Sequence, residues 1–147
     1  MAEGVSGGAR TARIARIGLG VLAVSSLPLG VWAVVAPRSF YDHFPGFGRH
    51  WVSPDGPYNE HLLRDFGGLN LALGIFTVCA AVWLLRPMVM AAALAWFASS
   101  VPHLLYHVLN LDHFDSTDQV GIVAGLVVAP VIAVVLLAVS RSLPART

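Results

Sequence analysis

The sequence contains little charge and almost no cysteine. Only 12% of its 147 residues are charged, whereas 56% are hydrophobic, and the mean hydropathy is +0.72. Soluble domains carry about 25% charged residues, so this composition excludes an ordinary soluble domain and indicates a membrane protein. The single cysteine, Cys79, lies in an apolar stretch and excludes an intrachain disulfide. We interpret it as a small buried hydrophobic residue.

Lysine is absent, and the nine arginines form no basic run. The formal net charge is +1, and no segment interleaves basic with aromatic residues. This pattern excludes a nucleic-acid-binding protein. The sequence also contains no nucleophile elbow, P-loop or dinucleotide-binding fingerprint. Enzymatic activity therefore stays open, without a motif in its favour.

Four apolar stretches are long enough to cross a membrane, since about 20 residues span a hydrocarbon core of about 30 Å. They predict an all-α, integral membrane four-helix bundle in up-down-up-down order. The expected spans are 17–36, 62–85, 88–109 and 120–139, with external loops at 37–61 and 110–119 and tails at 1–16 and 140–147. The fourth span carries a ridge of small residues, Gly121, Gly125, Ala129 and Ala133, which favours close helix packing.

The first span has a second interpretation as a cleaved signal peptide, because three arginines precede it. A signal peptide has a shorter apolar region, and Ala33 to Pro37 is a poor cleavage site. We therefore expect the span to be retained and to kink at Pro28. The small, polar residues 1–16 predict a mostly disordered tail.

The arginines predict the orientation of the chain in the membrane. Six of them fall on the side of the two tails, and only Arg38, Arg49 and Arg64 fall on the other side. By the positive-inside rule, we expect a multi-pass protein of the plasma membrane with both termini cytoplasmic. All six histidines and seven of the eight acidic residues are then extracytoplasmic. No charged residue lies in the middle of a span, which argues against a transporter.

The segment from Pro37 to Tyr58, between the first and second helices, is rich in aromatic residues, proline and glycine. Its prolines and glycines exclude a long helix or strand, and aromatic residues of this kind favour a membrane–water boundary. We predict an aromatic extracytoplasmic cap. Within it, Asp55 is interpreted as a turn residue, and Asn59 as the N-cap of the second helix.

Histidines lie near the outer end of both the second and the third helix. His61 and Asp65 share one stripe of the second helix, and His103 and His107 share one stripe of the third. At 1.5 Å per residue, Asp65 and His107 each stand about 30 Å from the connection between the helices, so the stripes are level. Whether they face each other does not follow from the pattern, because both helices are apolar nearly all round.

Paired imidazoles with a neighbouring carboxylate are ligands that suit Zn, Fe or Cu and argue against Ca or Mg. The candidate metal ligands are therefore His61, Asp65, His103 and His107, with Glu60 as a ligand or as a residue that orients an imidazole. Gly67 and Gly68 would permit close helix contact on this face.

Other interpretations of these residues stay open. They can be solvated at the membrane boundary, with Glu60 paired to Arg64 and no cofactor bound, or they can form a polar network for a small molecule or a lipid head group. Haem ranks below a metal ion, because His103 and His107 on one helix cannot both be axial ligands of one haem. The loop histidines, His43, His50 and His113, are expected to face solvent.

The opening of the second helix, from Asn59 through Arg64-Asp65-Phe66-Gly67-Gly68 to Gly74, resembles small four-helix bacterial membrane proteins of the actinobacterial type. The function of that family is unknown, so the resemblance implies a fold and no residue roles. Two hypotheses follow from the sequence. One is a metal-binding or redox membrane protein, and the other is a non-enzymatic accessory or scaffold subunit that contacts another membrane protein or a second copy of itself.

Overall fold

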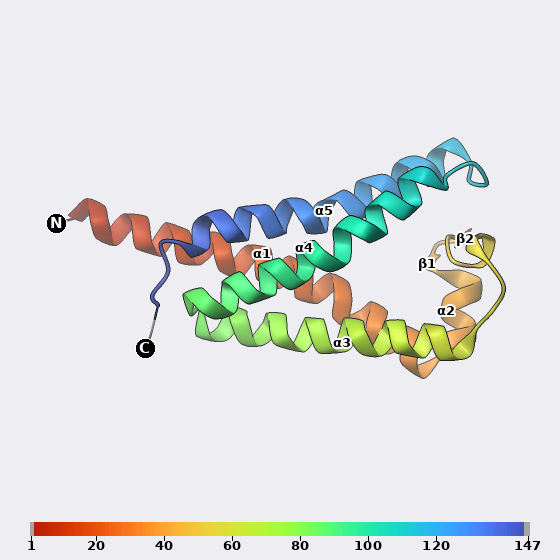
Figure 1. Cartoon of the computed structure of the whole chain (residues 1–147), viewed down its shortest axis with the longest axis horizontal. Coiled ribbons are helices and arrows are strands. Elements are labelled where there is room, and N and C mark those ends of the chain that lie inside the picture. Colours follow the sequence, from red (N-terminus) through yellow and green to blue (C-terminus); the bar gives the residue numbers. More distant parts are fainter. Residues whose placement is uncertain (1, 146–147) are drawn as a thin grey trace.

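The computed structural model describes residues 2–145, with side chains from residue 7 onward. Four of its helices are long and apolar enough to cross a membrane: α1 (Ala2–Val35), α3 (Glu60–Trp83), α4 (Arg86–Leu109) and α5 (Ser116–Ser140). The prediction of four apolar helices of membrane-spanning length is thereby confirmed. Figure 1 shows the start of α1, the α3–α4 turn and the end of α5 at one end of the molecule, which we call the tail end.

The helix bounds differ from the expected ones for local reasons. α1 begins at Ala2, so the expectation of a disordered segment over residues 1–16 is wrong for its described part. Extending an existing helix adds one hydrogen bond per residue fixed, which favours propagation from the apolar span. α3 ends at Trp83 because Leu84 is left-handed, with φ of 49°. α5 begins early because Asp115 accepts hydrogen bonds from the backbone N–H groups of Thr117 and Asp118.

Residues 37–58 form the cap at the opposite end, which we call the cap end (Figure 1). The cap contains the short helix α2 (Pro37–His43), the hairpin strands β1 (Pro45–Gly46) and β2 (Arg49–His50), and the 3-10 turn η1 (Ser53–Asp55). As expected, it has no long helix or strand among its residues. Phe40 is only 2% exposed and packs against Ala33 of α1 and Leu63 of α3. The cap is therefore joined to α1 and α3 by packing as well as by the chain.

The long helices associate as two close pairs, α1 with α3 and α4 with α5. α1 also contacts α5, and α3 contacts α4, but both of these contacts are much less extensive than those within the pairs. Figure 1 shows α4 diverging from α3 as both run from their shared turn toward the cap end. We therefore describe the molecule as two halves. The first half is α1, α3 and the cap, and the second half is α4, α5 and the loop between them.

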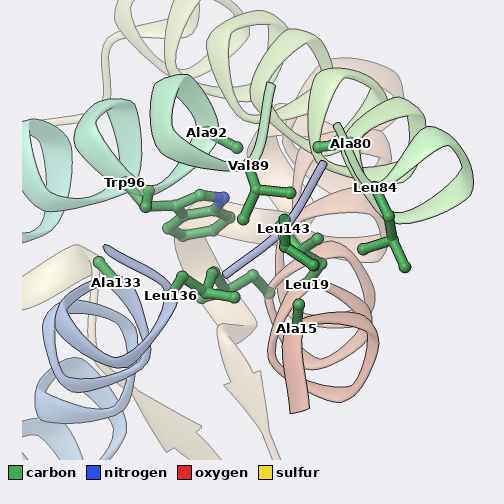
Figure 2. Close-up of a cluster of buried hydrophobic side chains, with 12 residues drawn as sticks. Ala15, Leu19, Ala80, Leu84, Val89, Ala92, Trp96, Ala133, Leu136 and Leu143 are labelled. Atoms are coloured by element: carbon green, nitrogen blue, oxygen red, sulfur yellow. The ribbon is translucent and has the colours of Figure 1, made fainter. Parts of the chain in front are cut away.

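The main apolar core lies toward the tail end and joins both halves (Figure 2). Its fully buried members come from α1, α3, α4 and α5, and include Leu19, Ala80, Val89 and Leu136. The segment after α5 contributes Leu143, which is 8% exposed.

Polar groups in the same region are also paired, and one of these pairs, between Trp96 and Thr77, crosses from one half to the other. The indole Nε1 of Trp96 donates to Thr77 Oγ1 at 2.8 Å, and that hydroxyl donates to the carbonyl of Leu73 at 2.7 Å. The backbone N–H of Arg86 donates to the carbonyl of Pro144 at 2.8 Å.

Two glycines bring α1 and α3 into close contact. A Cβ added at Gly67 would lie 2.9 Å from the carbonyl oxygen of Gly30, and one added at Gly30 would lie 2.9 Å from that of Gly67. Farther along α3, a Cβ at Gly74 would lie 2.7 Å from Ser26 Oγ. Within lipid, helices associate through such close packing, since the lipid tails are as apolar as the side chains.

The contact between Gly67 and α1 predicts that alanine substitutions at Gly67 and at its neighbour Gly68 have different effects on stability. Gly67→Ala places a methyl group against backbone, so we expect it to destabilise the protein by about 1–3 kcal/mol. Gly68→Ala is the matched control, because a Cβ there meets nothing within 4 Å. It should be neutral or stabilising by up to about 1 kcal/mol through helix propensity. Unfolding in detergent, followed by circular dichroism, compares them, and equal stability of the two variants would contradict the contact.

Candidate functional site

The predicted residues on α3 are exposed and paired with one another. The side chain of His61 is 87% exposed, and its Nε2 lies 3.2 Å from Asp65 Oδ2. Glu60 accepts a hydrogen bond from Arg64 at 2.8 Å. Arg64 also donates to the carbonyl of Val34 at the end of α1, where a cation stabilises the helix dipole. On α3, these residues therefore form local ion pairs.

Of the predicted residues on α4, His107 belongs to the inward face of that helix, whereas His103, one turn earlier, is exposed. His107 continues the buried stripe formed by Val89, Trp96 and Ser100, at helical spacing. It is 8% exposed, and its Nδ1 is buried without a hydrogen-bond partner. The ring of His103 lies 4.8 Å from the ring of His107 in an edge-to-face arrangement.

The structure does not bring the α3 and α4 residues together. Gly67, which the sequence analysis assigned to the face with the histidines, packs against α1 instead, and Gly68 faces open space. Because α3 turns 100° per residue, His61 and Asp65 lie roughly opposite Gly67 and therefore point away from the bundle. In residues 2–145, no group of three His, Cys, Asp or Glu side chains is arranged to hold a metal ion. Metal binding stays a prediction.

The α4 histidines instead meet the cap through Asp55. Asp55 Oδ1 lies 2.9 Å from Nε2 of His113, in the loop between α4 and α5, and Asp55 Oδ2 lies 3.9 Å from Nδ1 of His107. We call Asp55, His103, His107 and His113 the Asp55 cluster. The sequence analysis had assigned Asp55 to a turn and His113 to solvent. No sequence signal connected them, because the hydrogen bond joins residues 58 positions apart.

The cap holds Asp55 in place through a ring of local contacts. The hydroxyl of Tyr41 donates to the carbonyl of Gly56 at 2.6 Å, directly after η1. The guanidinium of Arg38 lies 5.7 Å from the ring of Tyr41 and 5.1 Å from that of Tyr58. A hydrogen bond from Arg38 Nε to Asp42, at 2.7 Å, raises the pKa of the guanidinium. These contacts fix the turn that presents the carboxylate of Asp55.

A second bridge between the halves centres on Asp118, near the start of α5. Its Oδ1 accepts hydrogen bonds from Arg49 at 2.6 Å and from the indole of Trp51 at 2.7 Å. The indole also lies on Gly121, where an added Cβ would be 3.0 Å from the ring. Gly121 of the small-residue ridge thus contacts Trp51 of the cap, whereas a Cβ added at Gly125 would have nothing within 4 Å.

No known protein family, curated protein or solved structure matches the chain. Four helices of this length and composition nevertheless indicate a multi-pass membrane protein.

The packing of the Trp51 indole on Gly121 can be tested by substituting the two glycines of the small-residue ridge on α5. Gly121→Leu should displace the indole, because its side chain would occupy the space that the ring now fills. The emission of Trp51, obtained by subtracting the spectrum of a Trp51→Phe counterpart, should then shift to the red and become easier to quench with acrylamide. Gly125→Leu, one turn along the helix, should leave the emission unchanged. An unchanged emission spectrum in Gly121→Leu would contradict the packing of Trp51 on Gly121.

Proposed function

We propose that the protein spans the plasma membrane in alternating directions, with both termini in the cytoplasm and the cap outside. The distribution of charge supports this orientation, since arginines are enriched on the cytoplasmic side of membrane proteins. Arg10, Arg13, Arg16, Arg86 and Arg141 are all exposed toward the tail end. Arg146 lies outside the described residues.

Cysteine labelling tests the orientation. In a Cys79→Ser background, a cysteine placed at Phe47, whose side chain is fully exposed in the hairpin of the cap, should react with a membrane-impermeant maleimide in intact cells. A cysteine at Ser142, which is exposed after α5, should react only after permeabilisation. The reverse pattern would overturn the proposed orientation.

We further propose that the protein binds a divalent transition-metal ion through the Asp55 cluster. The observation that carries this proposal is the buried Nδ1 of His107, which has no hydrogen-bond partner and lies 3.9 Å from Asp55 Oδ2. A buried polar atom left without a partner costs about 1–3 kcal/mol, so its retention calls for an explanation. A metal ion between the two atoms would supply the missing interaction.

The spacing and chemistry of the cluster are close to those of a metal site. Zinc binds nitrogen and oxygen at about 2.1 Å, so two ligands at tetrahedral angles stand about 3.4 Å apart. His107 Nδ1 and Asp55 Oδ2 would need to approach by only a few tenths of an ångström from their 3.9 Å separation. His103, whose ring lies 4.8 Å from that of His107, is a candidate for a third ligand. His113 lies 2.9 Å from the other oxygen of Asp55, as outer residues of metal sites do.

The proposal keeps part of the ligand set predicted from the sequence. His103 and His107 stay in it, Asp55 and His113 are added, and the donor types still suit Zn, Fe or Cu. Glu60, His61 and Asp65 are left out, because on α3 they pair with one another or with Arg64. Haem gains no support, since α3 and α4 diverge toward the cap end (Figure 1), and His61 is 87% exposed and paired with Asp65 of its own helix. The accessory-subunit hypothesis stays a prediction.

Metal titration of the detergent-purified protein tests this proposal. We expect about one Zn²⁺ per chain, as in a single tetrahedral site. His107→Phe should weaken binding by at least about tenfold, whereas His61→Ala should bind as the parent protein does. Since His107→Phe also removes an unpaired buried nitrogen, its stability without metal should be equal to or above that of the parent. Equal binding by His107→Phe and the parent would overturn the proposal.

A further inference from the structure

We infer that the Asp55 cluster is a clasp between the two halves, so that an ion bound there closes the cap end of the molecule. This inference rests on the proposed metal binding and adds a conformational consequence to it. The ligands come from both halves. Asp55 belongs to the cap and therefore to the half with α1 and α3, whereas His103, His107 and His113 belong to the half with α4 and α5.

The distribution of apolar contacts explains why a clasp would matter there. The main core, which includes Leu19, Ala80, Val89 and Leu136, draws on all four long helices but lies toward the tail end. The second buried cluster, formed around Phe40, contains only residues of the first half. Among the described residues, neither of these buried clusters joins the two halves at the cap end. The tail end can therefore act as the hinge about which the halves separate.

Besides the packing of Trp51 on Gly121, polar side chains make the connection at the cap end. Asp55 meets His107 and His113, while Asp118 accepts hydrogen bonds from Arg49 and Trp51. The side chains of His113 and Asp55 are 38% and 21% exposed, and access of solvent weakens a contact of this kind. Metal–ligand bonds are stronger and directional. An ion would therefore convert a weak connection at Asp55 into a firm one.

The clasp lies at the edge of an open groove between the halves. The groove has a volume of about 500 Å³, and its walls include Phe47, Arg49 and Pro54 from the cap and His113 and Phe114 from the loop between α4 and α5. Pro54 precedes Asp55 in η1, and His113 is its hydrogen-bond partner. Because the two walls belong to different halves, a closer approach of Asp55 to the α4 histidines would narrow the groove. Metal occupancy would therefore regulate access to it.

Distance measurements between spin labels test the clasp. In the Cys79→Ser background, labels replace Pro57 of the cap and Asp112 of the α4–α5 loop, both of which are exposed. The protein is reconstituted in lipid nanodiscs and measured by pulsed electron spin resonance with and without Zn²⁺, which has no unpaired electron. We expect Zn²⁺ to remove the long-distance part of the distribution. Zn²⁺ content is determined on the same samples.

Variants separate the clasp from general effects on the cap. Asp55→Asn and His107→Phe remove one ligand from each half, so both should abolish the response to Zn²⁺. Asp118→Ala removes the acceptor of the second bridge without touching the cluster, and it should broaden the metal-free distribution while preserving the response. His61→Ala should behave as the parent does. Two ligand variants on different elements keep the test valid if one of them does not fold.

The outcomes distinguish this inference from the proposed function. If the parent binds Zn²⁺ and the label distances do not change, the clasp is wrong and the metal site stands. If the parent binds no Zn²⁺, both are wrong. If Asp55→Asn keeps the full change in distance, Asp55 does not connect the halves and the clasp is overturned.

Discussion

The close approach of α1 and α3 at Gly30 and Gly67 determines how the rest of the molecule is arranged. Each glycine leaves room for the backbone of the other helix, and a Cβ on either would come within 3.0 Å of backbone atoms. In lipid, packing of this kind takes the place of the hydrophobic effect as the main attraction between helices. The contact fixes the rotation of α3 about its own axis. It therefore also fixes which of the polar residues at its start face the bundle.

The outward position of His61 and Asp65 follows from that rotation. Once Gly67 and Gly74 face α1, the opposite stripe of α3 faces away from the bundle. On α4, the buried stripe through Val89 and Trp96 leads to His107. The two histidine stripes therefore stand on helices of different halves, one facing outward and the other facing the cap.

The sequence predicted the helices well because their signals are local. Long apolar runs indicate membrane-length helices, and the predicted N-cap Asn59 accepts a hydrogen bond at the start of α3. The cap at Asp115, which starts α5 before the expected residue 120, was not predicted. The rotation of each helix could not be predicted, because α3 and α4 are apolar nearly all round and only a long-range glycine contact decides between their faces. The role of Asp55 depends on the cap folding back over a loop 58 positions farther along. The composition of the turn and of the loop does not indicate that the two segments meet.

The two ends of the molecule are built from different interactions, and this difference bears on function. At the tail end, fully buried residues such as Leu19 and Leu136 interlock, and the indole of Trp96 is paired with Thr77. Such packing has one favoured arrangement and resists change. At the cap end, Asp55 bridges His113 while the nearby Nδ1 of His107 is unpaired. A phenylalanine at position 107 would fill similar space without that unpaired nitrogen, so stability alone does not explain the histidine. The metal ion proposed above would give this nitrogen a partner, and the packing at the tail end would hold α4 and the cap close enough to share it.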